Sequence, residues 1–348
     1  MNLKEFKAII SAKSNQSLED LMLAARRETL KHFGRTIQLY SPLYLSNECV
    51  NSCTYCGFNR RSKIKRITLD IKQVEKEAQF LRKQGFQHIL LLTGEDSSRV
   101  PVDYLENAIR TAKDLFVSVS IEVYPLREED YSRLIAAGVD GLTIYQETYH
   151  LPTYHRVHPD GPKRDFKWRL GAPERAARAG MRKIGIGFLL GLYDWRDEAL
   201  KLAEHLQSLL KNFWQAQFQI SFPRINLPAH AYRQAGGRQA PIEADFKVGY
   251  PVSDQEFIRL LCAFRLLFPQ IGFTLSTRER AKLRDKIFPF GFTQMSAGSK
   301  TFPGAYSVGI KSGKQFEIAD DRTPRQVVKA LVKSGYEPVW KDWERSFA

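Results

Sequence analysis

The chain has 348 residues, 43% of them hydrophobic, and its 53 lysines and arginines outnumber its 38 acidic residues to give a net charge of +15. This length and composition exclude a disordered chain, and four cysteines exclude a disulfide scaffold. The longest apolar run is far shorter than the roughly 20 residues of a membrane span. The basic residues are spread along the chain, which indicates a solvated surface more than a nucleic-acid-binding tail.

The first 35 residues predict amphipathic helices rather than a secretory signal, so we expect a cytoplasmic protein with a helical extension outside the core. From residue 36 to residue 348, strand-like runs alternate with helical segments, which predicts one α/β domain, a (βα)8 TIM-type barrel with a C-terminal closing segment. The eight predicted strands are 37–46, 88–94, 117–126, 141–148, 183–192, 218–225, 272–279 and 292–299. Predicted helices include one that begins at Asp70 with a capping box to Gln73, and others at 173–180, 196–212, 255–267 and 324–335.

The stretch 226–252 contains several Pro and Gly residues and shows no periodicity. It follows the sixth predicted strand, so it would lie at the carboxyl-terminal mouth of the barrel, where barrel active sites occur. Loops of this length within a compact domain are usually functional. We interpret it as a partial lid, and a surface insertion is an equal alternative.

Three cysteines, Cys49, Cys53 and Cys56, lie directly after the first predicted strand. Three thiolates on one loop can bind three irons of a [4Fe–4S] cluster and leave the fourth iron open to chelate S-adenosylmethionine. A zinc site is the alternative, but structural zinc sites usually need a second pair of cysteine or histidine ligands. Cys262 lies on an apolar helical face, which predicts a buried, inert thiol. The nearby His150, His155 and His158 are interpreted as loop residues without a metal.

The Cys-x3-Cys-x2-Cys motif with Tyr55 before its last cysteine resembles the radical S-adenosylmethionine (radical SAM) superfamily. The wider run PLYLSNECVNSCTYCGF is similar to the aromatic amino acid lyases of that superfamily, and most similar to the tyrosine lyases of thiamine biosynthesis. Further similar segments follow in the same order, namely LLLTGE, EVYPL, YQETYH, SFPR, LSTRE, ADDRTP and PVWKDW.

This resemblance implies roles for side chains toward the cofactor. Tyr55 would lie against the adenine of S-adenosylmethionine, and Glu95 would contact its methionyl amine. Glu122 would face the ribose hydroxyls, and Arg169 would bind the carboxylate. The chain departs from the family after Arg169, where Gly171 and Ala172 replace the usual acidic residue and threonine.

The resemblance also implies a substrate site on the seventh strand. In LSTRE, Arg278 would bind the carboxylate of the amino acid substrate. If the segment is extended, Thr274, Ser276 and Arg278 all point into the barrel, because alternate residues of a strand share a face. Residues 145–147 and the hydroxyls of Ser221, Ser296 and Ser299 are candidates for the lining of the same cavity.

The implied reaction is cleavage of the Cα–Cβ bond of L-tyrosine to 2-iminoacetate and p-cresol, with 5′-deoxyadenosine and methionine as co-products. It begins with loss of hydrogen from the tyrosine amine. The implied partners are flavodoxin or ferredoxin as electron donor and thiazole synthase as the acceptor of the imine. No membrane partner is expected.

Other readings of the sequence stay open. A tryptophan lyase would share the same carboxylate clamp. The tyrosine lyase of hydrogenase maturation carries a further cluster domain and is disfavoured, because no cysteine follows Cys262. A cluster-bearing nucleic-acid-binding protein and a zinc-stabilised scaffold are the remaining alternatives.

Overall fold

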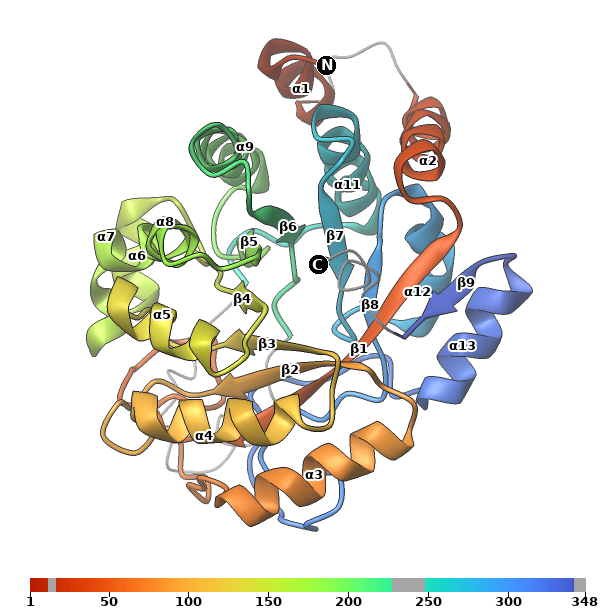
Figure 1. Ribbon diagram of the computed structural model, residues 1–348. Helices are drawn as coiled ribbons and strands as arrows, with labels where there is room; N and C mark the ends of the chain where they lie inside the picture. The colour runs from red at the N-terminus through yellow and green to blue at the C-terminus, as the bar shows by residue number, and fades with distance from the viewer. Residues whose placement is uncertain (12–16, 227–247, 341–348) are drawn as a thin grey trace, which may run out of the picture.

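A closed barrel of eight parallel strands forms the centre of the molecule (Figure 1). The computed structural model describes residues 1–11, 17–226 and 248–340. The strands follow one another in sequence order, and β1 pairs with both β2 and β8 to close the barrel. They are β1 (Thr36–Ser46), β2 (His88–Thr93), β3 (Ser118–Glu122), β4 (Gly141–Thr143), β5 (Lys183–Gly187), β6 (Gln217–Ser221), β7 (Gly272–Leu275) and β8 (Gln294–Ser296). The predicted TIM-type fold is confirmed.

Helices surround the barrel and cover the outer faces of its strands (Figure 1). They are α3 (Ile71–Lys83), α4 (Val102–Lys113), α5 (Glu128–Ala136), α6 (Leu151–Val157), α7 (Phe166–Leu170), α8 (Ala172–Arg178), α9 (Trp195–Asn212), α11 (Asp254–Leu267), α12 (Ala281–Ile287) and α13 (Pro324–Lys333). Short 3-10 turns occur at Pro162–Arg164 and Phe288–Phe290. The predicted capping box of α3 is present, because Asp70 accepts the backbone N–H of Gln73 and the Gln73 side chain accepts that of Asp70. None of the described helices is long and apolar enough to cross a bilayer.

Two helices precede the barrel, α1 (Leu3–Ile10) and α2 (Leu18–Phe33). The sequence predicted them outside the core, but Phe6 and Ile10 are fully buried. The Phe6 ring lies 5.0 Å from the Phe264 ring of α11, so the extension shares the core of the barrel helices. The domain boundary between residues 35 and 36 stays a prediction.

Most strands end several residues before their predicted ends. The prediction extended β3 to residue 126, but its pairing stops at Glu122. Val123, Tyr124 and Leu126 are buried all the same, and the Tyr124 hydroxyl donates to Val100 O at 2.6 Å. An apolar run predicts burial, and these residues are buried in loops of the barrel mouth rather than in the sheet.

The sequence predicted a closing segment at the C-terminal end of the barrel domain but did not specify its contacts. A ninth strand, β9 (Glu337–Val339), pairs with Thr36–Gln38 of β1. In the Gly- and Ser-rich segment after β8, the backbone N–H groups of Tyr306 and Val308 donate to the buried Glu77 carboxylate at 2.9 and 2.8 Å. Most of the predicted lid, residues 227–247, lies outside the described residues.

Candidate active site

Three cysteine thiols, on the loop that follows β1, lie beside a cavity in the barrel mouth. Cys53 is buried, Cys49 and Cys56 are partly exposed, and all three are free thiols. Burial raises the pKa of Cys56 to about 11, and the nearby Cys49 sulfur adds to this shift. Burial also raises the pKa of Cys53 well above its ordinary value. Thiolates at these positions need a positive partner, and the iron of a cluster supplies one.

These thiols fit an iron–sulfur cluster by their number, by their place on one loop and by the preference of iron–sulfur clusters for thiolate ligands. Within residues 1–11, 17–226 and 248–340, no three cysteine, histidine or carboxylate side chains converge closely enough to hold a single ion. The sequence predicted that His150, His155 and His158 lie in a loop, but His155 lies in α6 and the other two flank that helix. Cys262 lies apart from the site and is fully buried, as predicted.

The end of β2 supports the cysteine loop. Glu95 O accepts the Val50 N–H at 2.9 Å, and the Glu95 carboxylate accepts the side-chain amide of Asn51 at 2.7 Å. A Cβ on Gly94 would lie 2.1 Å from Glu48 O, so only glycine permits this close approach. Glu95, predicted to contact the methionyl amine, therefore lies beside the cysteine loop.

The cavity holds about 850 Å³, including open solvent at its mouth. Its walls bring together many side chains that the sequence singled out: Tyr55, Cys56, Glu122, Tyr145, Glu147, Ser221, Ser276, Arg278, Ser296 and Ser299. Gln146, between two lining residues, instead donates to Phe166 O at 3.5 Å. The structure thus resolves which side chains of 145–147 face the cavity.

A buried carboxylate lies between two cations at one wall. Lys163 Nζ is 2.7 Å from Glu147 Oε1, and Arg169 Nη2 is 3.5 Å from the same atom. Burial by itself raises the pKa of Glu147, but the two cations outweigh burial and lower it. Arg169 Nε also donates to Tyr145 O at 2.6 Å, so part of its guanidinium is already engaged. Glu147 has a φ of 71°, a left-handed conformation that is uncommon for a residue other than glycine.

Glu122, at the end of β3, is a second acidic group in the cavity. Burial raises its pKa to about 7, and the negative charge of Glu147 adds to the shift. Three nearby cations lower the pKa of Glu122 but do not cancel the rise, namely Arg278, Arg169 and Lys163. The side chain therefore changes charge near neutral pH in the ligand-free protein, and it can accept hydrogen bonds from a diol.

Arg278 enters the cavity just after β7. Its guanidinium carbon lies 3.5 Å from the centre of the Phe316 ring, and it forms no ion pair with the described residues. Burial lowers its pKa from the ordinary value, because a desolvated cation without a close anion is unfavourable. The next residue, Glu279, is anchored by an ion pair with Arg224. Arg278 is therefore a cation in the cavity that an anionic ligand would stabilise.

Tyr55 presents its ring to the cavity next to Cys56. Lys163 Nζ lies 5.6 Å from the ring centre, and the hydroxyl lies 2.7 Å from His158 Nε2. An aromatic face of this kind stacks well on a nucleobase. No local sequence signal indicates the His158 contact, since the two residues are 103 positions apart.

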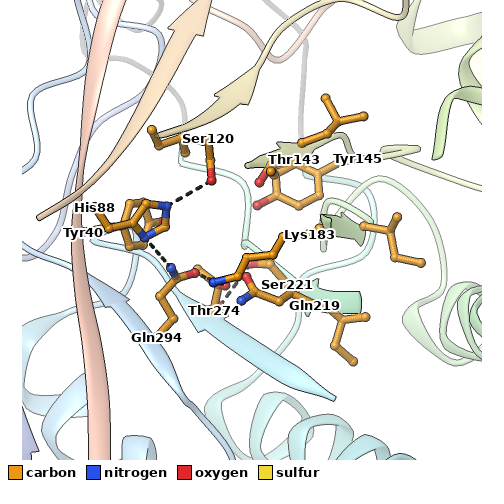
Figure 2. A pocket seen from close by; sticks show the side chains of 16 residues that line it. Tyr40, His88, Ser120, Thr143, Tyr145, Lys183, Gln219, Ser221, Thr274 and Gln294 are labelled. Carbon is orange, nitrogen blue, oxygen red and sulfur yellow. Dashed lines mark hydrogen bonds between the residues drawn. The ribbon is translucent and has the colours of Figure 1, made fainter. Parts of the chain in front are cut away.

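Beneath the cavity, the barrel interior is a polar chamber (Figure 2). His88 Nε2 lies 3.0 Å from Ser120 Oγ, and the Gln294 amide nitrogen lies 3.1 Å from His88 Nδ1. Thr274 lines this chamber and donates to Gln294 Oε1 at 3.0 Å, whereas Ser276 and Arg278 line the cavity above. The interior of such barrels is usually filled by branched apolar side chains. The three residues predicted to face inward do so, but at two different depths.

Other cavity residues were missed from the sequence. Lys163 lies in the 3-10 turn Pro162–Arg164, which has no recognisable motif, and Phe316 follows a Gly- and Ser-rich segment. Tyr44 donates to Gln315 Oε1 at 2.6 Å across 271 positions. Alternation along the first strand could have pointed to Tyr44, but no local signal marks Gln315.

The comparisons with known proteins agree with this geometry. The family model of the Radical SAM superfamily matches residues 43–206, and that of the Biotin and Thiamin Synthesis associated domain matches residues 221–337. Over 338 residues the chain is 42% identical to 2-iminoacetate synthase of Escherichia coli (strain K12), covering 97% of this chain and 86% of that protein. The chain belongs to the 2-iminoacetate synthase family of radical SAM enzymes. Radical SAM enzymes use a [4Fe–4S] cluster and S-adenosylmethionine.

Solved structures place this member of the 2-iminoacetate synthase family among radical SAM barrels. HydG, a maturase of the [FeFe]-hydrogenase, matches with a TM-score of 0.88 and 31% identity over 98% of this chain and 73% of that chain. HydG from Carboxydothermus hydrogenoformans matches with a TM-score of 0.88 and 32% identity, covering 99% and 77% of the two chains. Methylornithine synthase (PylB) matches with a TM-score of 0.76 at 20% identity, covering 97% and 94%, which shows the shared fold alone.

Proposed function

We propose that the chain is a 2-iminoacetate synthase, which cleaves the Cα–Cβ bond of L-tyrosine to 2-iminoacetate and p-cresol. The co-products are 5′-deoxyadenosine and methionine. The relative of that name is 42% identical over 97% of the chain. Arg278 carries the proposal, because it is a partly buried cation in the cavity that Cys56 also lines and forms no ion pair with the described residues. The carboxylate of an amino acid is an anion that would complete this site.

The cofactors are assigned to the residues around the cysteine loop. Cys49, Cys53 and Cys56 would hold the [4Fe–4S] cluster. When bound, the cluster and S-adenosylmethionine supply a 5′-deoxyadenosyl radical by one-electron cleavage. Tyr55 would support the adenine and Glu122 the ribose diol. Glu95 would accept a hydrogen bond from the methionyl amine. Arg169, which already contacts Tyr145 O and Glu147, would bind the methionyl carboxylate.

The substrate would lie on the opposite wall. Arg278 would hold the carboxylate of tyrosine and thereby present its amine to the cofactor, as efficient near-attack geometry requires. Ser276 would provide a hydroxyl beside this clamp, and Thr274, in the chamber below, would support the floor through its bond to Gln294. The 4-hydroxybenzyl fragment gains one electron and one proton to become p-cresol.

Exposed basic residues follow the cysteine loop and support docking of an acidic reductant, flavodoxin or ferredoxin. Arg60, Arg61, Lys63 and Lys65 are exposed, whereas Arg66 donates to Phe58 O at 2.8 Å and belongs to the loop structure. Attraction between opposite charges speeds such encounters. We also propose a cytoplasmic location, where the cluster thiols stay reduced, and transfer of the unstable imine to thiazole synthase.

Product analysis tests the proposal. The protein would be reconstituted anaerobically with iron and sulfide, reduced with dithionite, and given S-adenosylmethionine with L-tyrosine or L-tryptophan. We expect p-cresol from tyrosine and no 3-methylindole from tryptophan. Formation of 5′-deoxyadenosine without p-cresol would contradict the substrate assignment and keep the superfamily.

A further inference from the structure

The hydroxyl of Tyr55 is held by a histidine whose ring orientation is fixed. His158 Nδ1 lies 2.9 Å from Tyr154 O, and a carbonyl oxygen can only accept, so Nδ1 carries the proton. Burial and the charge of Lys163 lower the pKa of His158 well below its ordinary value, so the ring is neutral. Nε2 is then an acceptor, and the Tyr55 hydroxyl donates to it at 2.7 Å.

The segment that carries His158 also holds the backbone of the cysteine loop. Ser52 N–H donates to Asp160 O at 3.2 Å, and Thr54 N–H donates to Val157 O at 3.0 Å. Further along, the backbone N–H of Lys163 donates to Asn51 Oδ1 at 2.8 Å. The segment 157–163 therefore follows the cysteine loop over several residues.

His158 has little freedom to move within this segment. Its side chain is fully buried, and its ring lies 4.2 Å from the Tyr154 ring. A tyrosine ring can rotate about its Cα–Cβ and Cβ–Cγ bonds unless its far end is bound. Here the backbone on either side of Tyr55 is hydrogen-bonded, with Thr54 N–H donating to Val157 O and Cys56 N–H to Cys53 O. The Tyr55 hydroxyl is bound by the His158 ring, which is itself held by Tyr154 O and by the Tyr154 ring.

We propose that His158 is a positioning residue that fixes the plane of the Tyr55 ring against which S-adenosylmethionine binds. This inference rests on the proposed cofactor role of Tyr55. His158 does not line the cavity, so it acts through Tyr55 and not on the cofactor itself. Loss of the bond frees the ring, and binding of the cofactor must then order it again, which weakens affinity.

A second tyrosine–histidine pair provides a matched control. The Tyr149 hydroxyl lies 2.9 Å from His205 Nδ1, and the two rings are 5.8 Å apart with a 77° interplanar angle. The Tyr55 and His158 rings are 5.6 Å apart at 81°. His205 belongs to α9, and neither Tyr149 nor His205 lines the cavity that Tyr55 lines, so His205→Leu removes a similar contact outside the cofactor site.

The test measures binding of S-adenosylmethionine to the reconstituted holoprotein, by anaerobic calorimetry and by the change in the electron paramagnetic resonance spectrum of the reduced cluster. The variants are His158→Leu, Tyr55→Phe, their combination, His158→Gln and His205→Leu. Loss of one hydrogen bond predicts about tenfold weaker binding for His158→Leu and for Tyr55→Phe. The double variant should be no weaker than either single variant, because both remove the same bond.

The remaining variants separate positioning from a general structural effect. His158→Gln places an amide oxygen near the position of Nε2 and should recover most of the affinity, while His205→Leu should bind like the wild type. Wild-type affinity in His158→Leu, or additive losses in the double variant, would overturn the proposal. An equal loss in His205→Leu would also overturn it. These binding measurements do not contain the substrate L-tyrosine, so they test His158 even if the substrate assignment fails. A wild-type protein that does not bind S-adenosylmethionine would overturn both this inference and the proposed function.

Discussion

Replacing Arg278 by glutamine removes the cation that we assign to the substrate carboxylate. A hydrogen bond to a charged group contributes about 1.5–3 kcal/mol, so two such bonds contribute roughly 3–6 kcal/mol. Each 1.4 kcal/mol corresponds to about a factor of ten, so the KM for tyrosine should rise on the order of 100- to 10,000-fold. The free protein should lose little stability, because burial without an ion-pair partner already disfavours this cation.

The assay is steady-state formation of p-cresol at varied tyrosine, with binding of S-adenosylmethionine measured in parallel. We expect the KM for tyrosine to rise and cofactor affinity to stay at the wild-type value. Arg278→Lys keeps the charge but not the planar guanidinium, so its KM for tyrosine should lie between the values of the wild type and Arg278→Gln. Arg280→Gln is the control, since that side chain is 71% exposed and pairs with Asp254. A KM in Arg278→Gln equal to that of the control would refute the clamp.

Three further predictions follow from other contacts. The pKa of about 7 for Glu122 means that its carboxylate is ionised above neutral pH, so the affinity for S-adenosylmethionine should increase as the pH rises through this value. The pH dependence should vanish in Glu122→Gln. A pH dependence that persists in Glu122→Gln would exclude Glu122 as its source. Asp320→Asn breaks a fully buried ion pair with Arg284 and should lower the free energy of unfolding in urea by about 3–5 kcal/mol, whereas a loss below about 1 kcal/mol would contradict the pairing. Gly94→Ala places a Cβ against Glu48 O and should reduce the iron bound per chain after reconstitution; full loading would show that the loop tolerates the displacement.

Features encoded by neighbouring residues could be predicted from the sequence. The cysteine loop is contiguous, and the inward direction of Thr274 follows from alternation along β7. Ser276 and Arg278 also line a cavity, but β7 ends at Leu275 and a turn follows, so alternation does not account for these two side chains. The order of strands also follows from the alternation of strand and helix patterns. Strand ends could not be predicted in the same way. An apolar side chain such as Val123 is buried whether or not its backbone is paired in the sheet.

Contacts between distant segments account for most of what the sequence missed. Lys163 forms an ion pair with Glu147, and His158 accepts a hydrogen bond from Tyr55. Each contact depends on how the loops fold over the barrel mouth. The polar chamber was missed for a related reason. His88 and Ser120 belong to neighbouring strands, and their polarity within apolar runs is meaningful only when register brings them together.

Deuterium transfer tests the central claim most directly, because the account has Arg278 present the tyrosine nitrogen, and not a carbon, to the cofactor. The reconstituted enzyme would turn over unlabelled L-tyrosine in D2O, where the amine hydrogens exchange and the Cα hydrogen does not. The account predicts that 5′-deoxyadenosine gains deuterium in D2O and gains none in H2O from tyrosine deuterated at Cα. The opposite pattern, with deuterium only from the Cα-labelled substrate, would contradict it.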